Sequence, residues 1–201
     1  MAQDGGNMAE KNQKRNDILA SARALFSERG FHDTKMEDIA QGAGVGKGTL
    51  YEYFKNKQDI FDETCIEYLR TITEDVNRIG SMDISFKEKL IMLFNERNNT
   101  IDEVFDKNPV DYIMSYKNII SEKTLITMFA CVSEINSVII DMIEAGKNEG
   151  AVKRDIPSDI IACCIVGTMG EYFNLKKNKK DGSFNDDDII FNLLFDGFGV
   201  K

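Results

Sequence analysis

The segment Gly42-Ala-Gly-Val-Gly-Lys-Gly-Thr49 places four glycines, a lysine and a threonine within eight consecutive residues. A glycine-rich segment of this kind can bind the phosphates of a nucleotide, but two patterns for doing so fail here. Aligned on Gly46 and Lys47, the pattern G-x-x-x-x-G-K-[ST] requires a glycine where Gln41 stands. It also requires a serine or threonine where Gly48 stands. The dinucleotide pattern G-x-G-x-x-G fails as well, and no β-branched strand precedes the segment.

Helical signals flank the segment on both sides. Thr34 followed by Glu37 is a capping-box pattern, which predicts a short helix over residues 35–41. Apolar spacing predicts a second short helix over residues 47–54. Two short helices joined by a tight glycine-containing turn form a helix-turn-helix, whose second helix enters the major groove of DNA. We expect Gly44 to adopt the positive φ of that turn, because glycine does so without strain.

Helical periodicity continues along the rest of the chain, and no segment alternates as a strand does. Only two prolines interrupt the 201 residues, so long helices are permitted nearly everywhere. We therefore predict an all-α protein of about nine helices, with an N-terminal three-helix helix-turn-helix domain and a C-terminal helical bundle. The predicted helices span residues 12–29, 35–41, 47–54, 57–79, 85–105, 110–120, 122–149, 159–175 and 186–198.

The net charge of −9 is distributed unevenly. Residues 1–60 contain nine basic and nine acidic side chains, so residues 61–201 carry the whole excess of negative charge. Residues 44–57 are locally basic, with Lys47, Lys55 and Lys57 against Glu52. Phosphate contacts are short-ranged at cellular salt, so this local excess suits DNA even on an acidic protein. The alternative is an ordinary solvated face of lysines.

Composition excludes several other classes. No apolar run approaches the roughly 20 residues that cross a bilayer, and the first seven residues lack the features of a signal peptide. We therefore expect no membrane partner. The four cysteines lack C-x-x-C spacing and are expected to be reduced, as in the cytoplasm. His32 is the only histidine, which leaves no familiar catalytic dyad. We expect no metal, no cofactor and no enzymatic activity.

Two segments resemble the DNA-binding domain of tetracycline-repressor-like (TetR/AcrR) transcriptional regulators. They read Ile18-Leu-Ala-Ser-Ala-Arg-Ala-Leu-Phe-Ser-Glu-Arg-Gly-Phe31 and Thr34-Lys-Met-Glu-Asp-Ile-Ala-Gln-Gly-Ala-Gly-Val-Gly-Lys-Gly-Thr-Leu-Tyr-Glu-Tyr-Phe-Lys-Asn-Lys-Gln-Asp-Ile-Phe61. The resemblance is strong over residues 12–62. Beyond it, the segment from Gly150 to Pro157 is similar to the loop before the family's last two helices.

The resemblance implies a homodimeric, cytoplasmic, ligand-responsive repressor, which binds a pseudo-palindromic double-stranded DNA operator and is released by a small-molecule effector. It also implies a division of the chain into a flexible leader (1–11), a helix-turn-helix domain (12–57), a connecting helix (58–80) and a ligand-binding and dimerisation domain (81–201). Activation instead of repression remains an alternative. So does a helical protein-interaction module or an enzyme without DNA binding.

The resemblance further implies which residues meet DNA. Lys47 and Tyr51 would lie near base edges, and Thr34, Tyr53 and Lys57 would meet phosphates. Many family members carry histidine at the position of Tyr53, and a tyrosine hydroxyl can still donate to a phosphate. The full set of implied DNA-binding residues is Thr34, Lys35, Met36, Gly46, Lys47, Gly48, Thr49, Tyr51, Tyr53 and Lys57.

Two further sets of candidates fall in the C-terminal half. Aromatic, methionine and amide side chains there could line an effector cavity or simply fill the core: Met92, Phe94, Asn95, Asn98, Phe105, Tyr112, Met114, Tyr116, Phe129 and Met142. The last two helices carry apolar residues that could pair with a second copy or be buried within one chain: Ile161, Ile165, Thr168, Met169, Tyr172, Ile190, Leu193 and Leu194.

Overall fold

The computed structural model describes residues 4–99, 109–178 and 187–200, and this part of the chain folds into nine helices. They are α1 (Asp4–Asp33), α2 (Met36–Gly42), α3 (Lys47–Tyr53), α4 (Lys57–Gly80), α5 (Phe86–Asn99), α6 (Pro109–Tyr116), α7 (Glu122–Asn148), α8 (Ser158–Asn178) and α9 (Asp187–Phe198). Within the described ranges, β-pairing is limited to one isolated bridge between Val152 and Gly199. The predicted all-α class is confirmed.

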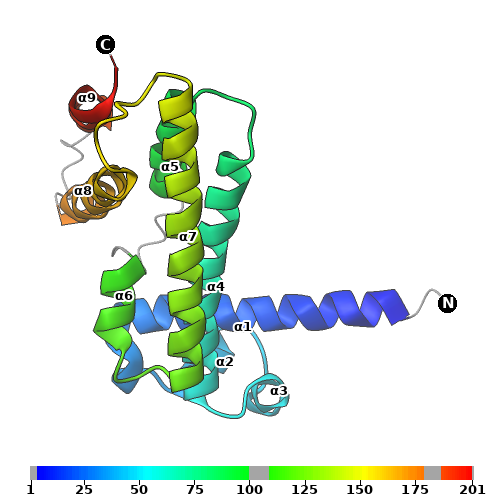
Figure 1. Cartoon of the computed structure of the whole chain (residues 1–201). Helices are drawn as coiled ribbons and strands as arrows, with labels where there is room; N and C mark the ends of the chain where they lie inside the picture. The colour runs from blue at the N-terminus through cyan, green and yellow to red at the C-terminus, as the bar shows by residue number, and fades with distance from the viewer. Residues whose placement is uncertain (1–3, 100–108, 179–186, 201) are drawn as a thin grey trace.

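Helices α4 and α7 form the central pair of the molecule and run side by side (Figure 1). Helices α1, α2 and α3 gather at one end of this pair, and α6 packs on α7 near the same end (Figure 1). Helices α5, α8 and α9 lie toward the other end (Figure 1). The first half of α1 projects beyond the rest of the molecule as a single helix (Figure 1).

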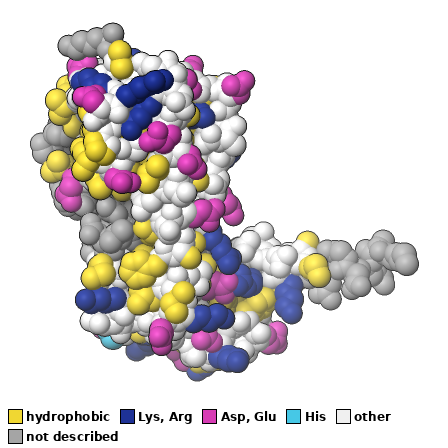
Figure 2. Space-filling view, viewed as in Figure 1, with side chains coloured by type: hydrophobic (Ala, Val, Ile, Leu, Met, Phe, Trp, Pro, Cys, Tyr) yellow, Lys and Arg dark blue, Asp and Glu magenta, His cyan; other side chains and the backbone are white. Residues whose placement is uncertain are grey.

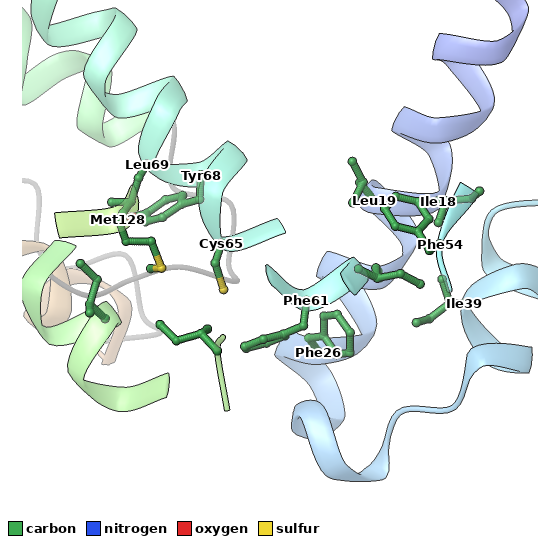
Figure 3. Close-up of a cluster of buried hydrophobic side chains, with 14 of the residues drawn as sticks. Ile18, Leu19, Phe26, Ile39, Phe54, Phe61, Cys65, Tyr68, Leu69 and Met128 are labelled. Carbon is green, nitrogen blue, oxygen red and sulfur yellow. The ribbon is translucent and has the colours of Figure 1, made fainter. Parts of the chain in front are cut away.

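One hydrophobic core, which we call the lower core, joins the first three helices to the central pair. It contains Phe26 of α1, Leu50 of α3, Phe61 of α4 and Met128 of α7, among other buried residues. Figure 3 shows Phe61 beside Phe26, with Cys65 and further side chains of α4 continuing toward Met128. The ring centroids of Phe26 and Phe61 are 5.0 Å apart in an edge-to-face arrangement. The lower core is therefore continuous from the helix-turn-helix to α4 and α7.

A second core, the upper core, fills the other end of the molecule. It joins the end of α4 to α5, the second half of α7, α8 and α9, through residues such as Ile79, Phe86, Ile143 and Ile165. Gly146 of α7 lies so close to Phe86 and Val152 that an added methyl group would overlap both. The sequence predicts a domain boundary near residue 80. The lower core extends across that boundary, because it also contains residues of α6 and α7.

By length and composition, α7 could cross a membrane. The sequence analysis found no apolar run long enough to cross a bilayer, whereas α7 contains an 18-residue window of high hydropathy with few charged residues. Its surroundings give the reason for its apolarity, since α7 packs against α4, α5, α6 and α8. Met128, Ile135 and Met142 of α7 are buried in the two cores. The apolar residues of α7 therefore serve a central core helix.

Several helix boundaries differ from the sequence prediction by three residues or more, among them the start of α1 and the end of α6. Helix α1 begins at Asp4 rather than at residue 12, in the segment expected to be a flexible leader. Apolar periodicity is absent there, but side-chain pairs at i,i+4 spacing support the helix, including Lys14 with Glu10 at 2.8 Å. Gly30 interrupts α1 with φ of 78°, as its predicted place at a helix end requires. Helix α6 ends at Tyr116, where backbone N–H groups of residues 119 and 120 turn back to its carbonyl.

Candidate DNA-binding surface

The turn between α2 and α3 has the geometry expected of a helix-turn-helix. Gly44 takes a φ of 66°, in the left-handed region, which confirms the role predicted for it. The backbone N–H of Gly44 donates to the carbonyl of Gln41 at 3.1 Å, and that of Val45 donates to the carbonyl of Ala40 at 3.0 Å. These bonds satisfy the carbonyls at the end of α2 and fix the direction in which α3 departs.

The inner sides of α2 and α3 are anchored to α1. Ile39 of α2 and Leu50 of α3 are fully buried in the lower core. Ser21 of α1 donates a hydrogen bond from Oγ to the carbonyl of Ile39 at 3.0 Å. Gly42 lies directly against the Ser21 hydroxyl, so that a side chain at this position would displace it. The opposite face of α3 is consequently held toward solvent in a fixed orientation.

The exposed face of α3 presents Lys47, Gly48 and Tyr51. Tyr51 is 46% exposed, so its ring is only partly packed against the rest of the chain. A Cβ added at Gly46 or Gly48 would meet no atom within 4 Å. Packing within the chain therefore gives no reason for a glycine at position 48, although glycine is less favourable than alanine in a helix. Thr49 is half-buried at the edge of this face.

Lys47 is paired across the motif with Glu37, which the sequence analysis had assigned to a capping box instead. Its Nζ donates to a carboxylate oxygen of Glu37 on α2 at 2.5 Å, and both side chains are more than half exposed. This hydrogen bond is the main cause of a lowered pKa for Glu37 and a raised pKa for Lys47. Such an exposed pair exchanges readily, because its net stabilisation in water is small. Lys47 is therefore accessible to an external anion in competition with Glu37.

Thr34 and Lys57 are held inside the motif by their side chains. Thr34 is buried, and its hydroxyl donates to the carbonyl of Gly30 at 2.8 Å and to that of Leu25 at 3.2 Å. The predicted capping box is therefore wrong: Lys35 occupies the N-cap position of α2, and no side chain caps the helix. The Thr34 hydroxyl instead caps the C-terminal part of α1, because the helix is interrupted at Gly30 and carbonyls there lack helical hydrogen-bond donors.

The Lys57 ammonium is likewise directed inward. It donates to the carbonyls of Phe31 at 2.5 Å, His32 at 3.1 Å and Thr34 at 2.7 Å, and it lies 4.4 Å from the centroid of the Phe31 ring. Three donors meet three acceptors, so the ammonium group is fully used within the chain. Lys57 thus positions the segment between α1 and α2. A sequence cannot reveal such acceptors, because they are backbone groups more than twenty residues away.

The other implied DNA contacts lie around the same face. Lys35 is exposed beside the start of α2. Met36 and Tyr53 are half-buried and pack against the lower core. The structure therefore brings together Lys35, Gly46, Lys47, Gly48, Thr49 and Tyr51 on one accessible surface, while Thr34, Met36, Tyr53 and Lys57 support it from within.

The candidate effector residues fall into separate groups. Phe94 and Met142 are buried in the upper core, and Met92 packs against it. Tyr116 packs against the lower core, and burial raises the pKa of its hydroxyl. Asn95, Met114 and Phe129 are exposed. Phe105 lies outside the described residues, and Asn98 and Tyr112 belong to helices at positions whose side chains are not described.

The candidate dimer residues divide between two faces of α8 and α9. Ile161, Ile165 and Tyr172 are buried in the chain's own upper core. Thr168, Met169, Ile190 and Leu194 are half-buried, and Leu193 is 70% exposed. The sequence prediction missed the outward apolar residues of these helices, which are Ile160, Leu175 and Ile189. Helix α8 is apolar on two faces, so periodicity alone did not show which face is turned outward.

Comparison with known proteins agrees with the geometry of the motif. Residues 18–64, which comprise the second half of α1 with α2, α3 and the start of α4, match the family described as bacterial regulatory proteins of the tetR family. The chain belongs to the TetR family. It is a helix-turn-helix transcriptional regulator and not an enzyme, as its sequence predicted. Within the described residues, no group of three or more His, Cys, Asp or Glu side chains is arranged to hold a metal ion.

Relatives and solved structures extend this likeness beyond the motif. An uncharacterized HTH-type transcriptional regulator, YhgD of Bacillus subtilis (strain 168), is 28% identical over 142 residues, which cover 68% of this chain and 70% of YhgD. The HTH-type transcriptional repressor KstR2 of Rhodococcus jostii (strain RHA1) is 25% identical over 150 residues, or 75% of this chain and 73% of KstR2. The crystal structure of FadR from Bacillus subtilis in complex with stearoyl-CoA matches with a TM-score of 0.70 at 21% identity, over 90% of this chain and 97% of that one. The fold is therefore that of a TetR-family regulator along nearly the whole chain.

Proposed function

We propose that this TetR-family regulator is a homodimeric, cytoplasmic repressor that binds a pseudo-palindromic DNA operator through α3. The observation that carries the proposal is the exposed face of α3, where Gly48 has no neighbour and Tyr51 and Lys47 point away from the core. A lysine can donate to guanine O6 and N7 in the major groove, and a tyrosine can contact a thymine methyl group or a phosphate. Glycine at position 48 lets the helix backbone approach the bases closely.

A second copy of the chain is expected to cover the outward apolar residues of α8 and α9. Ile160, Leu175, Ile189 and Leu193 are all at least half exposed, and several large apolar side chains exposed on two neighbouring helices favour a protein interface. Gly167 is exposed on the same helix, where a small residue permits close helix approach. A two-fold dimer would present two copies of α3 to successive major grooves of one face of the duplex.

The effector that we propose is a long-chain acyl thioester. FadR of Bacillus subtilis, which shares the fold, was crystallised with stearoyl-CoA, and the upper core of this chain offers apolar side chains such as Met92, Phe94 and Met142 for an acyl chain. To release the operator, the effector must bind the DNA-free conformation more tightly than the DNA-bound one. Titration of the operator complex with stearoyl-CoA should release DNA, whereas coenzyme A alone should not. Release by neither compound would contradict this choice of effector without affecting operator binding.

The substitution Tyr51→Asp tests the placement of α3. Tyr51 is exposed, so the aspartate should leave folding and dimerisation intact, while its charge repels the phosphates of the duplex. Operator affinity, measured by fluorescence anisotropy, should fall to the level of unrelated DNA. Asn136→Asp adds the same charge at an exposed position of α7 and should bind as the wild type does. Operator binding that survives Tyr51→Asp would refute the proposed role of this face.

A further inference from the structure

Helix α3 is short, so its orientation depends on how its two ends are held. It has seven residues, and Leu50 is its buried residue. Its N-cap residue is Gly46, which has no side chain to cap the first turn. At the other end, the backbone N–H of Phe54 donates to the carbonyl of Leu50 at 3.0 Å, and the Phe54 ring is buried in the lower core. A contact that fixes Phe54 therefore also fixes the C-terminal end of α3.

The ring of Phe54 is held by α1. Figure 3 shows it near Ile18 and Leu19, and all three side chains are buried in the lower core. The guanidinium carbon of Arg15, which is also on α1, lies 5.6 Å from the centroid of the ring. A cation within about 6 Å of an aromatic ring face is attracted to it. Arg15 therefore adds an electrostatic attraction to the apolar packing of Phe54.

The same guanidinium group is bound by α4. Arg15 is paired with Glu63, and its Nη1 lies 3.8 Å from Oε1 of Glu67. The other oxygen of Glu67 lies 3.6 Å from Nη2 of Arg23 on α1. Burial is the main cause of a raised pKa for Glu67, and the charge of Arg23 is the largest opposing effect. These four side chains form a partly buried ionic cluster between α1 and α4.

The surroundings of Arg15 favour a role within the chain over a contact with DNA. Figure 2 shows Lys and Arg side chains interspersed with Asp and Glu side chains where α1 leaves the body of the molecule. Two carboxylates of α4 share the guanidinium group of Arg15, and a phosphate would have to displace them. A guanidinium group can pair with carboxylates along its edge while its face stacks on an aromatic ring, whereas the ammonium group of lysine is a point charge. The two kinds of contact made by Arg15 therefore require arginine.

We propose that Arg15 is a positioning residue for operator recognition. It joins Phe54 at the end of α3 to the carboxylates of α4, and it thereby fixes the direction in which Lys47 and Tyr51 face the bases. The proposal rests on operator binding by α3. Base contacts require placement within about 0.5 Å, whereas attraction to phosphates does not depend on sequence. Loss of the Arg15 contacts should therefore weaken discrimination between DNA sequences more than it weakens DNA binding in general.

The substitution Arg15→Lys tests the proposal without changing the charge. The readout is the ratio of affinities for the duplex enriched from a random pool and for an unrelated duplex. Loss of the stacked guanidinium should lower this ratio about 2- to 5-fold per protomer, or about 5- to 30-fold per dimer. The melting temperature should change by no more than about 2–4 °C, because partly exposed ion pairs contribute little to stability. A purely structural role would instead lower the melting temperature and leave the ratio unchanged.

The double variant Arg15→Gln/Glu63→Gln separates positioning from a direct phosphate contact. It removes one positive and one negative charge, so its net charge is that of the wild type. The ratio should fall, while the slope of log operator affinity against log salt should stay the same. If Arg15 contacted a phosphate in each protomer, the slope would decrease in magnitude by about 1.8, and that result would overturn the proposal.

Arg78→Lys is the matched control. It makes the same exchange in an ion pair at the far end of α4, where Arg78 lies 3.0 Å from Asp75, and it should keep the wild-type ratio. An unchanged ratio in Arg15→Lys, or an equal fall in Arg78→Lys, would overturn the proposal. Failure of the wild type itself to distinguish the two duplexes would count against operator binding by α3, and with it against this role of Arg15.

Discussion

Gly48→Ala should make the protein more stable and its operator binding weaker. Gly48 lies in the first turn of α3 with a negative φ, is exposed, and has no atom within 4 Å of an added Cβ. Alanine is therefore compatible with the folded chain. Relative to glycine it is worth about 0.5–1 kcal/mol in a helix, since it loses less backbone entropy on folding. For a chain of this size the melting temperature should rise by roughly 1–4 °C.

The opposite effect on DNA follows from the closeness of approach that the glycine permits. A methyl group forced into a packed interface costs typically about 1–3 kcal/mol, which corresponds to a loss of affinity of roughly 5- to 150-fold. Thermal unfolding in the absence of DNA gives the first quantity, and fluorescence anisotropy with the operator duplex gives the second. The test is whether stability rises while operator affinity falls, because a variant that is simply misfolded would lose both stability and affinity.

Asn136→Ala is the matched control for Gly48→Ala. Asn136 is exposed on α7, and alanine should stabilise that helix by about 0.5 kcal/mol. Its operator affinity should equal that of the wild type. If Gly48→Ala also binds the operator with wild-type affinity, the glycine is not required for approach to DNA, and the inference drawn from its empty surroundings is refuted.

Three further substitutions test other contacts of the structure. Lys57→Met should lower the free energy of unfolding by about 1–2 kcal/mol in denaturant titration, because three carbonyls lose a charged donor; unchanged stability would contradict the positioning role. Glu37→Gln should raise operator affinity about two- to five-fold by removing the competitor of Lys47, and a weaker complex would show that Glu37 orients the lysine instead. Leu193→Glu should convert the dimer to a folded monomer in analytical ultracentrifugation, and a persistent dimer would exclude this face.

The sequence was sufficient to predict the fold and the helix-turn-helix. Helical periodicity marked the nine helices, and Gly44 could be assigned a positive φ because a tight turn between two helices needs one. Signals of this kind depend only on residues that are close to one another in the sequence. The start of α1 was missed because residues 4–11 have no apolar stripe, so that their helix shows only in i,i+4 pairs such as Glu10 with Lys14.

The roles of individual polar side chains were harder to predict, because their partners lie far away in the chain. Lys57 was expected to meet a phosphate, but its ammonium group binds backbone carbonyls around Phe31. Thr34 was expected to cap α2 from its N-terminus, but its hydroxyl turns back to α1. Spacing identifies a basic or hydroxylated residue near a motif. It does not show whether the side chain of that residue already donates a hydrogen bond to an acceptor within the fold.

The two faces of α8 show the same limit for apolar residues. Ile161 and Ile165 belong to the apolar stripe that packs into the upper core, while Ile160 and Leu175 are turned outward. Both stripes are present in the sequence, and both have helical spacing. Which of them faces inward depends on where α7 and α9 lie, and only the tertiary structure contains that information.

Selection of bound duplexes from a random DNA pool by the purified protein tests the central claim most directly. Two copies of α3 related by a two-fold axis predict enrichment of one palindromic sequence, with half-sites about one helical turn or more apart. Affinity for the enriched site should fall steeply with salt, as phosphate contacts require. A folded protein that enriches no sequence, or enriches one without two-fold symmetry, would contradict the account of α3 as the reading element of a symmetric dimer.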